Sequence, residues 1–588
     1  MSRFSPNPVD RLRRIINHDQ ITLTLLAMAV GAVTGGGVIV FRDSIIAMQS
    51  FFFGEPGASL WQDAALLPWW QVIAVLVIGG AVIGLACKFL MPEGRPQGLA
   101  DVIEASALRG GSMSGRVALK AALINAASLG FGASVGREGP AVHFGAALGS
   151  WLAQVLRLNP ATSRTLLGCG AAAAVAASFN APIAGALFAS EVVLGHYALS
   201  AFAPIVIASV SATAVSRYYF GDFPAFSFPE HVIQSVWEYP AFIILGVIAG
   251  LTAVGFMKAI MSAADLAQRL ALPNWLKPAL GGLMVGLIAL WFPHVLGVGY
   301  GVTESAVMVA FPLGMLLAIL MAKIVATVIS IGFGFGGGVF SPALVIGAML
   351  GGAYGTIFTV LFPSLSTGIG AYSILGMGAV TAAVLGAPIS TALIVFEMTG
   401  DYALTLALMV TVVIASLITR EFHGGSFFIW QLERQGHDLR DGLEMALLRK
   451  IPVNSILSAA VDPAPLSLAM PEIRCRLQTS EAGELFVIDQ RGGLVGTITL
   501  ADLDRFAFDG ELDSLLVAGD VARRLIPHLI SDDTLETALD VMADQGKEYL
   551  PVVDNNETMI LLGSLRESRV RDAYNRALLQ SQREQRGF

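Results

Sequence analysis

Two short motifs hold the residues of this sequence that are best placed to do chemistry. One reads Gly136-Arg-Glu-Gly-Pro140, and the other, Gly338-Val-Phe-Ser-Pro342, repeats its glycine and proline spacing. Each proline opens a run rich in Ala, Gly and Leu, and proline is favoured in the first turn of a helix. We therefore expect a half-helix to begin near each proline, with its unpaired N–H groups and positive dipole end pointing at a common centre. Such a centre suits an anion.

The two motifs belong to an internal repeat. Residues 136–149 and 338–351 agree at seven positions without a gap, and Ala181-Pro-Ile183 recurs as Ala387-Pro-Ile389. Glu191 and Glu397 follow at matching distances. Shared Gly, Ala and Pro composition is the alternative explanation. Paired hydrophobic segments interrupted by Gly and Pro in corresponding halves indicate a binding site near the middle of a membrane.

Glu138 is the ionisable residue at the mouth of the first expected helix. A carboxylate is itself an anion, so it can occupy the centre and be displaced by a permeant ion, or swing away on protonation. A plain helix cap is the alternative. Arg137 is either an anion ligand or the partner of a nearby carboxylate. No second residue lies at a metal-ligand spacing from His143, so we expect its side chain to pack or to form hydrogen bonds. Lys323 either adds positive charge near the path, extends its ammonium group to the membrane surface or forms a structural ion pair.

Composition sets the class of protein. Of 588 residues, 55% are apolar and 14% are charged, against roughly 25% charged in soluble domains. Mean hydropathy is +0.69. These values exclude a soluble enzyme, a disordered chain and a nucleic-acid binder, and the net charge of −8 argues again against a polyanion partner. A polytopic α-helical membrane protein remains. Cys87, Cys169 and Cys475 lack the spacing of a disulfide framework or a zinc site.

Hydropathy and charge predict the organisation of the chain. Spanning segments are expected at Ile21–Phe41, Ala64–Cys87, Tyr239–Met257, Pro278–Phe292, Ala306–Ala322 and Tyr402–Thr419. The 73 residues from Ile324 to Phe396 include no Asp, Glu, Lys, Arg or His, yet Gly332–Gly338, Pro342, Pro363 and Gly386–Pro388 interrupt them. Broken helices at membrane depth are tolerated where they are buried in protein or line a cavity, which favours a transport path.

The predicted fold is an all-α polytopic membrane domain followed by a small α/β domain. Residues 1–19 form a basic segment, placed in the cytoplasm by the positive-inside rule. The membrane domain is expected over 20–430, a linker over 431–449, and a tail over 579–588. Between them, strands at Leu485–Asp489 and Leu494–Thr499, and again at Glu548–Asp554 and Met559–Leu565, predict two modules, 450–507 and 520–578.

Together with Phe179-Asn-Ala-Pro182 and Phe396-Glu-Met-Thr399, the two motifs resemble the CLC family of chloride channels and chloride/proton exchangers, over roughly residues 20–430. The resemblance implies an inverted-repeat membrane domain, a homodimer with one anion path per subunit, and chloride as the usual ion. It makes Glu138 the external gating glutamate. Backbone amides of Val339 and Phe340 would line the central anion site, and those of Gly136, Arg137 and Gly139 would lie near the outer one.

Three departures from the family pattern bear on mechanism. Gln97 is the best match to the serine that coordinates the ion, and Phe428 stands where an ion-contacting tyrosine is usual. In proton-coupled members a second glutamate follows the position of Glu191, and here that residue is Val192. A valine carries no proton, which favours a channel. A proton-coupled chloride antiporter, with another acid or a water chain as substitute, is the alternative.

The C-terminal modules resemble paired CBS modules through Gly496-Thr-Ile-Thr-Leu-Ala-Asp502 and Pro551-Val-Val-Asp554. Such pairs often bind adenine nucleotides such as ATP or AMP, which would place Thr499 at a phosphate and Asp502 at the ribose hydroxyls. A dimerisation or folding module without ligand is the alternative. A nucleotide sensor whose membrane part only signals is a third reading of the chain.

An enzyme is not expected, although Glu138 and Glu191 resemble an acid–base pair, because the sequence offers no nucleophile–His constellation and no metal site. The expected partners are chloride or another small monovalent anion, membrane lipid and a second copy of the chain, with no nucleic acid. The expected location is a bacterial inner membrane, with the N-terminus and the CBS domains in the cytoplasm.

Overall fold

The computed structural model of the chain describes residues 20–54, 60–197, 199–221, 236–436, 451–458, 463–480, 483–503, 515–524 and 526–586. The chain divides into two compact units, one comprising Met1–Arg440 with Gln585–Phe588, the other Asp441–Glu584. The basic segment 1–19 and residues 437–449 of the expected linker lie outside the described residues.

Every regular element described in the first unit before residue 437 is helical. The elements are α2 (Gln20–Phe53), α3 (Leu60–Leu66), α4 (Trp69–Leu90), α5 (Leu99–Leu108), α6 (Gly115–Gly130), α7 (Glu138–Val155), α8 (Pro160–Phe179), α9 (Pro182–Phe188), η1 (Ala189–Leu194), α10 (Leu199–Phe220), η2 (Val236–Glu238), α11 (Tyr239–Arg269), η3 (Asn274–Leu276), α12 (Lys277–Trp291), η4 (Pro293–Val295), α13 (Tyr300–Val307), α14 (Leu313–Gly332), α15 (Phe340–Leu361), α16 (Ile369–Leu385), α17 (Pro388–Thr399), α18 (Tyr402–His423) and α19 (Phe427–Arg434). Within the described ranges, seven helical stretches are long and apolar enough to cross a membrane.

Prolines end two of the spans expected from hydropathy. The span Ala64–Cys87 is wrong, because Pro68 has extended backbone and separates α3 from α4. The span Ala306–Ala322 is wrong as well, because α13 ends at Val307 and Pro312 precedes α14. Proline removes a backbone donor and disfavours helical geometry at the preceding residue. The breaks between α14, α15, α16 and α17 confirm the interrupted stretch, although Pro342 lies in the first turn of α15 and breaks nothing.

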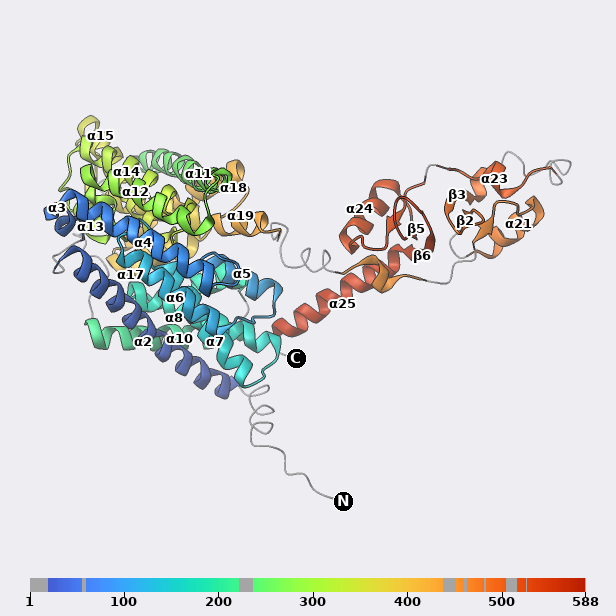
Figure 1. The fold of residues 1–588 in the computed structure, drawn as a ribbon, viewed down its shortest axis with the longest axis horizontal. Coiled ribbons are helices and arrows are strands. Elements are labelled where there is room, and N and C mark those ends of the chain that lie inside the picture. The colour runs from blue at the N-terminus through green and yellow to red at the C-terminus, as the bar shows by residue number, and fades with distance from the viewer. Residues whose placement is uncertain are drawn as a thin grey trace, which may run out of the picture. The chain divides into compact units, whose positions relative to one another are not determined.

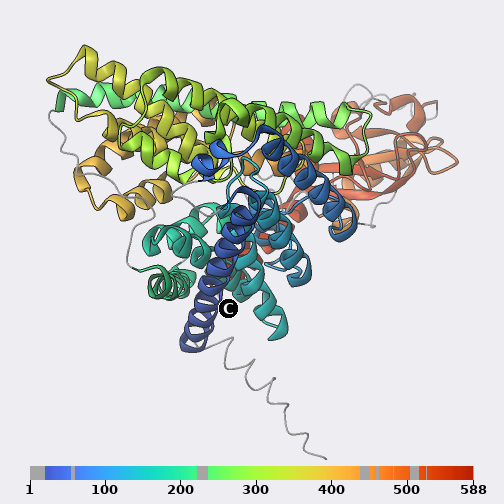
Figure 2. The same ribbon diagram turned by 60° about the vertical axis from the view of Figure 1, so that its left-hand side comes forward.

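The sequence repeat is also a structural repeat. The run α7–α10 recurs as α15–α18, and both α8 and α16 end on a residue with left-handed backbone, Asn180 (φ 57°) and Gly386 (φ 69°). An Ala-Pro pair follows each and opens α9 and α17. Figures 1 and 2 show most helices of the first half gathered on one side of this unit and most helices of the second half on the other.

The glycines that match between the two halves let helix backbones touch. A Cβ built on Gly145 of α7 would lie 2.3 Å from the carbonyl oxygen of Gly170 of α8. A Cβ built on Gly347 of α15 would lie 2.3 Å from the carbonyl oxygen of Gly376 of α16. Small residues at helix crossings permit such close approach in membranes. The repeat therefore preserves a packing geometry as well as a sequence pattern.

Each half also caps a helix of the other half. Glu191, in η1, accepts hydrogen bonds from the first N–H groups of α17, including that of Ser390 at 2.8 Å. Glu397, in α17, accepts hydrogen bonds from the first N–H groups of α9, including that of Ala184 at 2.8 Å. A carboxylate there satisfies unpaired donors and meets the positive dipole end. The two glutamates that align in sequence thus make reciprocal contacts across the repeat.

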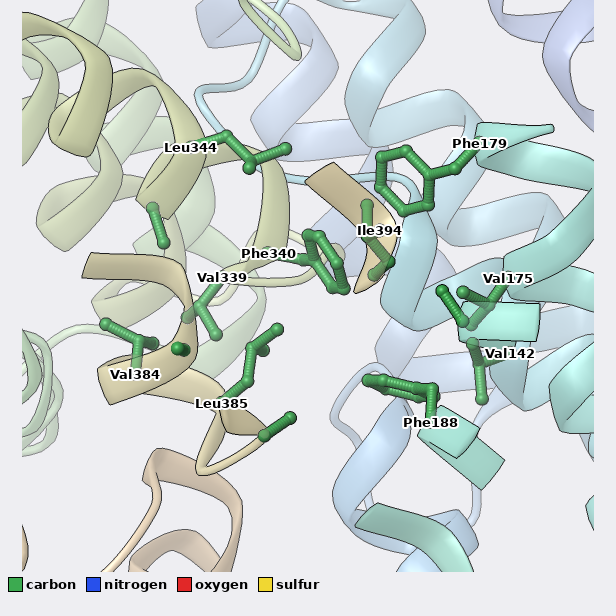
Figure 3. Packing of buried hydrophobic residues seen from close by; sticks show 14 of the residues in the cluster. Val142, Val175, Phe179, Phe188, Val339, Phe340, Leu344, Val384, Leu385 and Ile394 are labelled. Carbon is green, nitrogen blue, oxygen red and sulfur yellow. The ribbon is translucent and has the colours of Figure 1, made fainter. Parts of the chain in front are cut away.

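The hydrophobic core is continuous where the two halves meet. Figure 3 shows the Phe340 ring of α15 between Val339 on one side and Phe179 of α8 on the other. The ring centroid of Phe340 lies 5.0 Å from that of Phe179 and 6.2 Å from that of Phe188. This aromatic contact anchors the start of α15 against the first half.

The second unit contains two three-stranded sheets with the same plan. Their strands are β1 (Ala464–Pro465), β2 (Glu484–Ile488) and β3 (Leu494–Thr499), then β4 (Leu529–Ile530), β5 (Tyr549–Val553) and β6 (Leu561–Arg566). The first pair of each sheet is parallel and the second antiparallel. The helical elements are η5 (Val453–Ile456), α21 (Met470–Thr479), α22 (Leu500–Leu503), α23 (Ala518–Val521), α24 (Leu535–Gln545) and α25 (Glu567–Arg586). In Figure 1, α21 lies beside β2 and β3, and α24 beside β5 and β6. This confirms the small α/β domain of two modules, and α25 continues through most of the segment expected as a tail.

Candidate functional site

The two motifs meet backbone to backbone. The N–H of Gly136 donates to the carbonyl oxygen of Gly338 at 2.7 Å, and the N–H of Gly338 donates to that of Gly136 at 2.8 Å. Since α7 begins at Glu138 and α15 at Phe340, the N-terminal ends of both helices lie at one centre, as the sequence predicts. The expectation of half-helices is wrong for α15, whose 22 residues are long enough to span.

The carboxylate of Glu138 lies buried at this centre, with 1% of the residue exposed. The hydroxyl of Tyr300, the first residue of α13, donates to Oε1, and the hydroxyl of Ser341, in the first turn of α15, donates to Oε2. Nε of Arg137 lies 3.6 Å from Oε1, and its guanidinium stands over the Tyr300 ring, 4.7 Å from the centroid. An ionised carboxylate is an acceptor only, and this arrangement supplies donors to both oxygens.

Two cavities approach this carboxylate. The first, of about 350 Å³, is lined by Arg42, Arg137 and Tyr300 among others. The second, of about 180 Å³, is lined by Gly139 and other residues from the starts of α5, α15 and α19. Arg137 lines one cavity and Gly139 the other, so the residues on either side of Glu138 in the sequence face different spaces. We refer to these spaces as the Arg137 cavity and the Gly139 cavity.

Four of the expected anion-binding residues, Gln97, Gly139, Val339 and Phe428, line the Gly139 cavity together. The backbone carbonyl of Gln97 accepts a hydrogen bond from the Asn125 amide at 3.1 Å. Of the described residues that line this cavity, none carries a hydroxyl group.

The other expected residues take different places. The side chain of Phe340 is buried in the core, and the role expected of its backbone amide stays a prediction. Gly136 forms the bridge to Gly338, and Arg137 pairs with Glu138 and lines the Arg137 cavity. Val192 lies half-buried in η1 and packs against the apolar core.

Sequence reasoning missed three polar residues of the site. Ser341 could have been found from the sequence, because it is the polar residue inside the second motif. Tyr300 could not, because it lies 162 positions from Glu138 and belongs to neither motif. Arg95 lines the Gly139 cavity, where its Nη2 lies 2.8 Å from Asp101 and 2.7 Å from Glu93. The guanidinium is therefore already balanced by carboxylates.

Lys323 of α14 holds the loop that presents Tyr300. The residue is fully buried, and its Nζ donates to the carbonyl oxygens of Val295 and Gly297, both at 2.9 Å. Snorkelling is therefore wrong for Lys323. Gly299, just before Tyr300, has φ +89°, and a Cβ there would lie 2.7 Å from Val345. The loop geometry and the two hydrogen bonds from Lys323 together position Tyr300.

In the second unit, Thr499 and Asp502 contact each other. The Thr499 N–H and hydroxyl donate to Asp502 Oδ2 at 2.9 and 2.7 Å, and Arg523 Nη2 lies 2.7 Å from Oδ1. Partial burial raises the pKa of Asp502, but the hydrogen bonds from Thr499 and the Arg523 guanidinium outweigh it and lower the pKa. The two carboxylate oxygens accept hydrogen bonds from Thr499 and Arg523 in this arrangement, and nucleotide binding by Thr499 and Asp502 stays a prediction.

The fold and this site define a polytopic membrane protein of two inverted repeats whose motifs meet at a buried carboxylate, followed by a small α/β unit. The family model "Voltage gated chloride channel" matches residues 79–420, and the model "CBS domain" matches residues 518–576. The chain belongs to the voltage gated chloride channel family, the CLC family, and carries C-terminal CBS sequence.

Relatives and solved structures agree with this assignment. The voltage-gated ClC-type chloride channel ClcB of Escherichia coli (strain SMS-3-5 / SECEC) is 34% identical over 414 residues, which cover 69% of this chain and 97% of the relative. The structure of a slow cyanobacterial Cl⁻/H⁺ antiporter is 26% identical, with a TM-score of 0.62, over 71% of this chain and 98% of that protein. A eukaryotic CLC transporter, 19% identical with a TM-score of 0.62, shares the fold over 93% of this chain and 98% of its own.

Proposed function

We propose that this protein conducts chloride, or another small monovalent anion, through the membrane domain as a channel whose gate is Glu138. The observation that carries the proposal is the position of the Glu138 carboxylate, buried where the N-terminal ends of α7 and α15 meet, while its neighbours Arg137 and Gly139 line two different cavities. Relatives described as chloride channels and as a Cl⁻/H⁺ antiporter support an anion as the cargo.

The gate works by competition between two anions for one place. The N-terminal ends of α7 and α15 supply unpaired N–H groups and partial positive charge, which attract an anion. Glu138 occupies that place and is held by the hydroxyls of Tyr300 and Ser341. A permeant anion displaces the carboxylate, or a proton neutralises it. A partial positive field binds the anion weakly enough to release it, as conduction requires.

The side of the membrane follows from the basic N-terminal segment. If residues 1–19 lie in the cytoplasm, α2 crosses outward and the Arg137 cavity, lined by residues near the end of α2, opens outside. The chain returns through α4, so the Gly139 cavity, lined by Arg95–Asp101, opens to the cytoplasm. The CBS modules follow α19 and lie in the cytoplasm on the same reasoning. The membrane is the bacterial inner membrane.

A proton-coupled antiporter is the second candidate. Val192 argues against it, because this side chain carries no proton. A buried histidine, His143, has no hydrogen-bond partner for either ring nitrogen among the described residues, and this observation favours it. The two candidates differ in the reversal potential under a pH gradient: a channel shows only the potential set by chloride, whereas an antiporter shows an additional shift.

The decisive test of the gate is chloride efflux from liposomes that contain the purified full-length protein. Glu138→Gln and Glu138→Ala are expected to remove the pH dependence of the flux. Glu304→Gln provides the matched control, because it makes the same substitution at an exposed glutamate on α13, whereas Glu138 is buried. Wild-type pH dependence in both Glu138 variants would refute the gating role, and an absence of anion flux in the wild type would refute conduction.

We further propose a homodimer. Ile183 of α9 and Ile389 of α17 are related by the repeat, and both are half exposed, at 56% and 50%. The two side chains lie at the starts of α9 and α17, which pack against each other, and a second copy would cover both. The mass of the protein in detergent, measured by light scattering, is expected to equal two chains, and a mass of one chain would contradict the proposal.

A further inference from the structure

His143 is a buried polar residue that the gate described above does not use. It lies on α7 with 1% of the residue exposed, and neither ring nitrogen has a hydrogen-bond partner among the described residues. A neutral imidazole has one N–H donor and one acceptor nitrogen, so both remain unsatisfied. Buried polar groups without partners are rare and mark water sites or functional residues.

The position of His143 connects it to the Gly139 cavity. Gly139 lines that cavity, and His143 follows it by four residues, which places both on the same face of α7 and about 6 Å apart along the helix axis. The helix α5 packs against α7 and carries Asp101, which lines the same cavity. His143 is therefore one turn away from the cavity and one further residue away from Glu138.

The elements packed against α7 carry several charged groups. The helix α5 and the loop before it contribute Asp101 and Arg95, α2 carries Arg42 and Asp43, α6 carries Arg116 and Lys120, and α8 carries Arg164. Of these, Asp101 and Arg95 act on the charge of the imidazole. These two residues form an ion pair, so their fields largely offset each other at a distance. On α7 itself, Glu138 is the nearest acidic residue. An imidazolium here would lie one helical turn from the cavity that Asp101 lines and five residues along α7 from Glu138.

We infer that His143 carries protons between the cytoplasmic Gly139 cavity and Glu138, the task that Val192 cannot perform. This inference rests on the proposed function. One ring nitrogen binds a proton from water on the cavity side, which gives an imidazolium. The other nitrogen then releases its proton to water that reaches the Glu138 carboxylate. One proton enters and one leaves, so the imidazole returns to its neutral form. Glu138 accepts the released proton through water and becomes a neutral carboxyl group, which no longer competes with the permeant anion.

The test uses the full-length protein in liposomes, with the pH of each side set separately and with chloride and proton movement recorded together. Wild-type chloride flux is expected to depend on the pH of the cytoplasmic face. His143→Gln keeps a polar side chain of similar length but cannot carry a proton, and we expect it to reduce this pH dependence at least tenfold while chloride flux persists.

His294→Gln is the matched control. His294 is also buried, but it stacks on Trp61, 4.3 Å between ring centroids, and Trp61 lines the Arg137 cavity on the other side of the gate. It is expected to retain the wild-type dependence on cytoplasmic pH. His143→Glu returns a titratable group and is expected to restore the dependence at a different pH, which a purely structural role of His143 would not produce.

Each outcome distinguishes this inference from the proposed function. If His143→Gln keeps the wild-type dependence on cytoplasmic pH, or if the wild type has none, the role of His143 is refuted while gating by Glu138 stands. If chloride flux is the same in Glu138→Gln as in the wild type, the gate itself is refuted. If neither His143→Gln nor His143→Glu folds, a structural role is indicated and the inference is overturned.

Discussion

Replacing Ser341 by alanine removes one of the two hydroxyl groups that hold the Glu138 carboxylate. Replacing Tyr300 by phenylalanine removes the other and keeps the ring on which Arg137 stacks. A hydrogen bond to a charged group contributes about 1.5–3 kcal/mol. Because every 1.4 kcal/mol is a factor of ten, the lower value predicts that each variant raises the displaced population of Glu138, and hence chloride flux, about tenfold.

The two hydroxyls bind opposite oxygens of one carboxylate, so their effects are coupled. Residues that share one hydrogen-bonded group show interaction energies of about 0.5–3 kcal/mol, and we expect the double variant to differ from the product of the single effects. The assay is chloride efflux from liposomes at pH 7. Tyr354→Phe is the control, since the Tyr354 hydroxyl donates to the backbone of Ala241 and not to the gate.

The decisive comparison is made in a Glu138→Gln background. There the carboxylate is absent, and Ser341→Ala is expected to change the flux less than twofold. If Ser341→Ala accelerates efflux equally with and without the Glu138 carboxylate, the hydroxyl acts elsewhere. If it leaves the wild-type flux unchanged or slows it, the hydroxyl does not hold the gate closed, and the reasoning fails.

Three further predictions concern stability. Gly347→Ala places a Cβ 2.3 Å from the Gly376 carbonyl oxygen, so we expect a loss of about 1–3 kcal/mol, seen as a lower midpoint of thermal unfolding in detergent. Glu397→Ala removes the cap of α9 and should cost about 1 kcal/mol, with faster hydrogen exchange at the first amides of that helix. Hydrogen bonding to Thr499 and the ion pair with Arg523 outweigh burial and lower the pKa of Asp502, so its ionised form stabilises the fold above its unfolded pKa of about 3.9. This contribution is lost as the pH falls through the folded-state pKa, which should speed exchange of the Thr499 amide between pH 4 and pH 2, and not in Asp502→Asn.

The architecture was predictable where the signal is local. The spacing of glycines and prolines around Pro140 and Pro342 marks helix starts, and their repetition indicates that the starts correspond. Hydropathy windows did not predict the helix breaks at Pro68 and Pro312. A window averages over apolar residues, so it is insensitive to the single backbone donor that a proline removes. The prolines themselves were visible in the sequence.

The partners of Glu138 were not predictable, because they depend on tertiary folding. Tyr300 reaches the carboxylate from a helix 162 positions later, and its place is set by a loop that buried Lys323 holds. Nothing in the local sequence of Tyr300 records that contact. The pairing of Arg523 with Asp502 is similar, since it joins residues of the two CBS modules that are adjacent only in space.

The reciprocal contacts of Glu191 and Glu397 bear on how such a molecule arose. Glu191 of the first half caps α17 of the second half, and Glu397 of the second half caps α9 of the first half. Exchanging the two halves would therefore exchange the two contacts. A shorter ancestor with a single half would have made both contacts by pairing with an identical chain about a two-fold axis. Fusion of two gene copies would then have converted an association between molecules into one within a molecule, and neither glutamate could afterwards be lost without exposing the helix end it served.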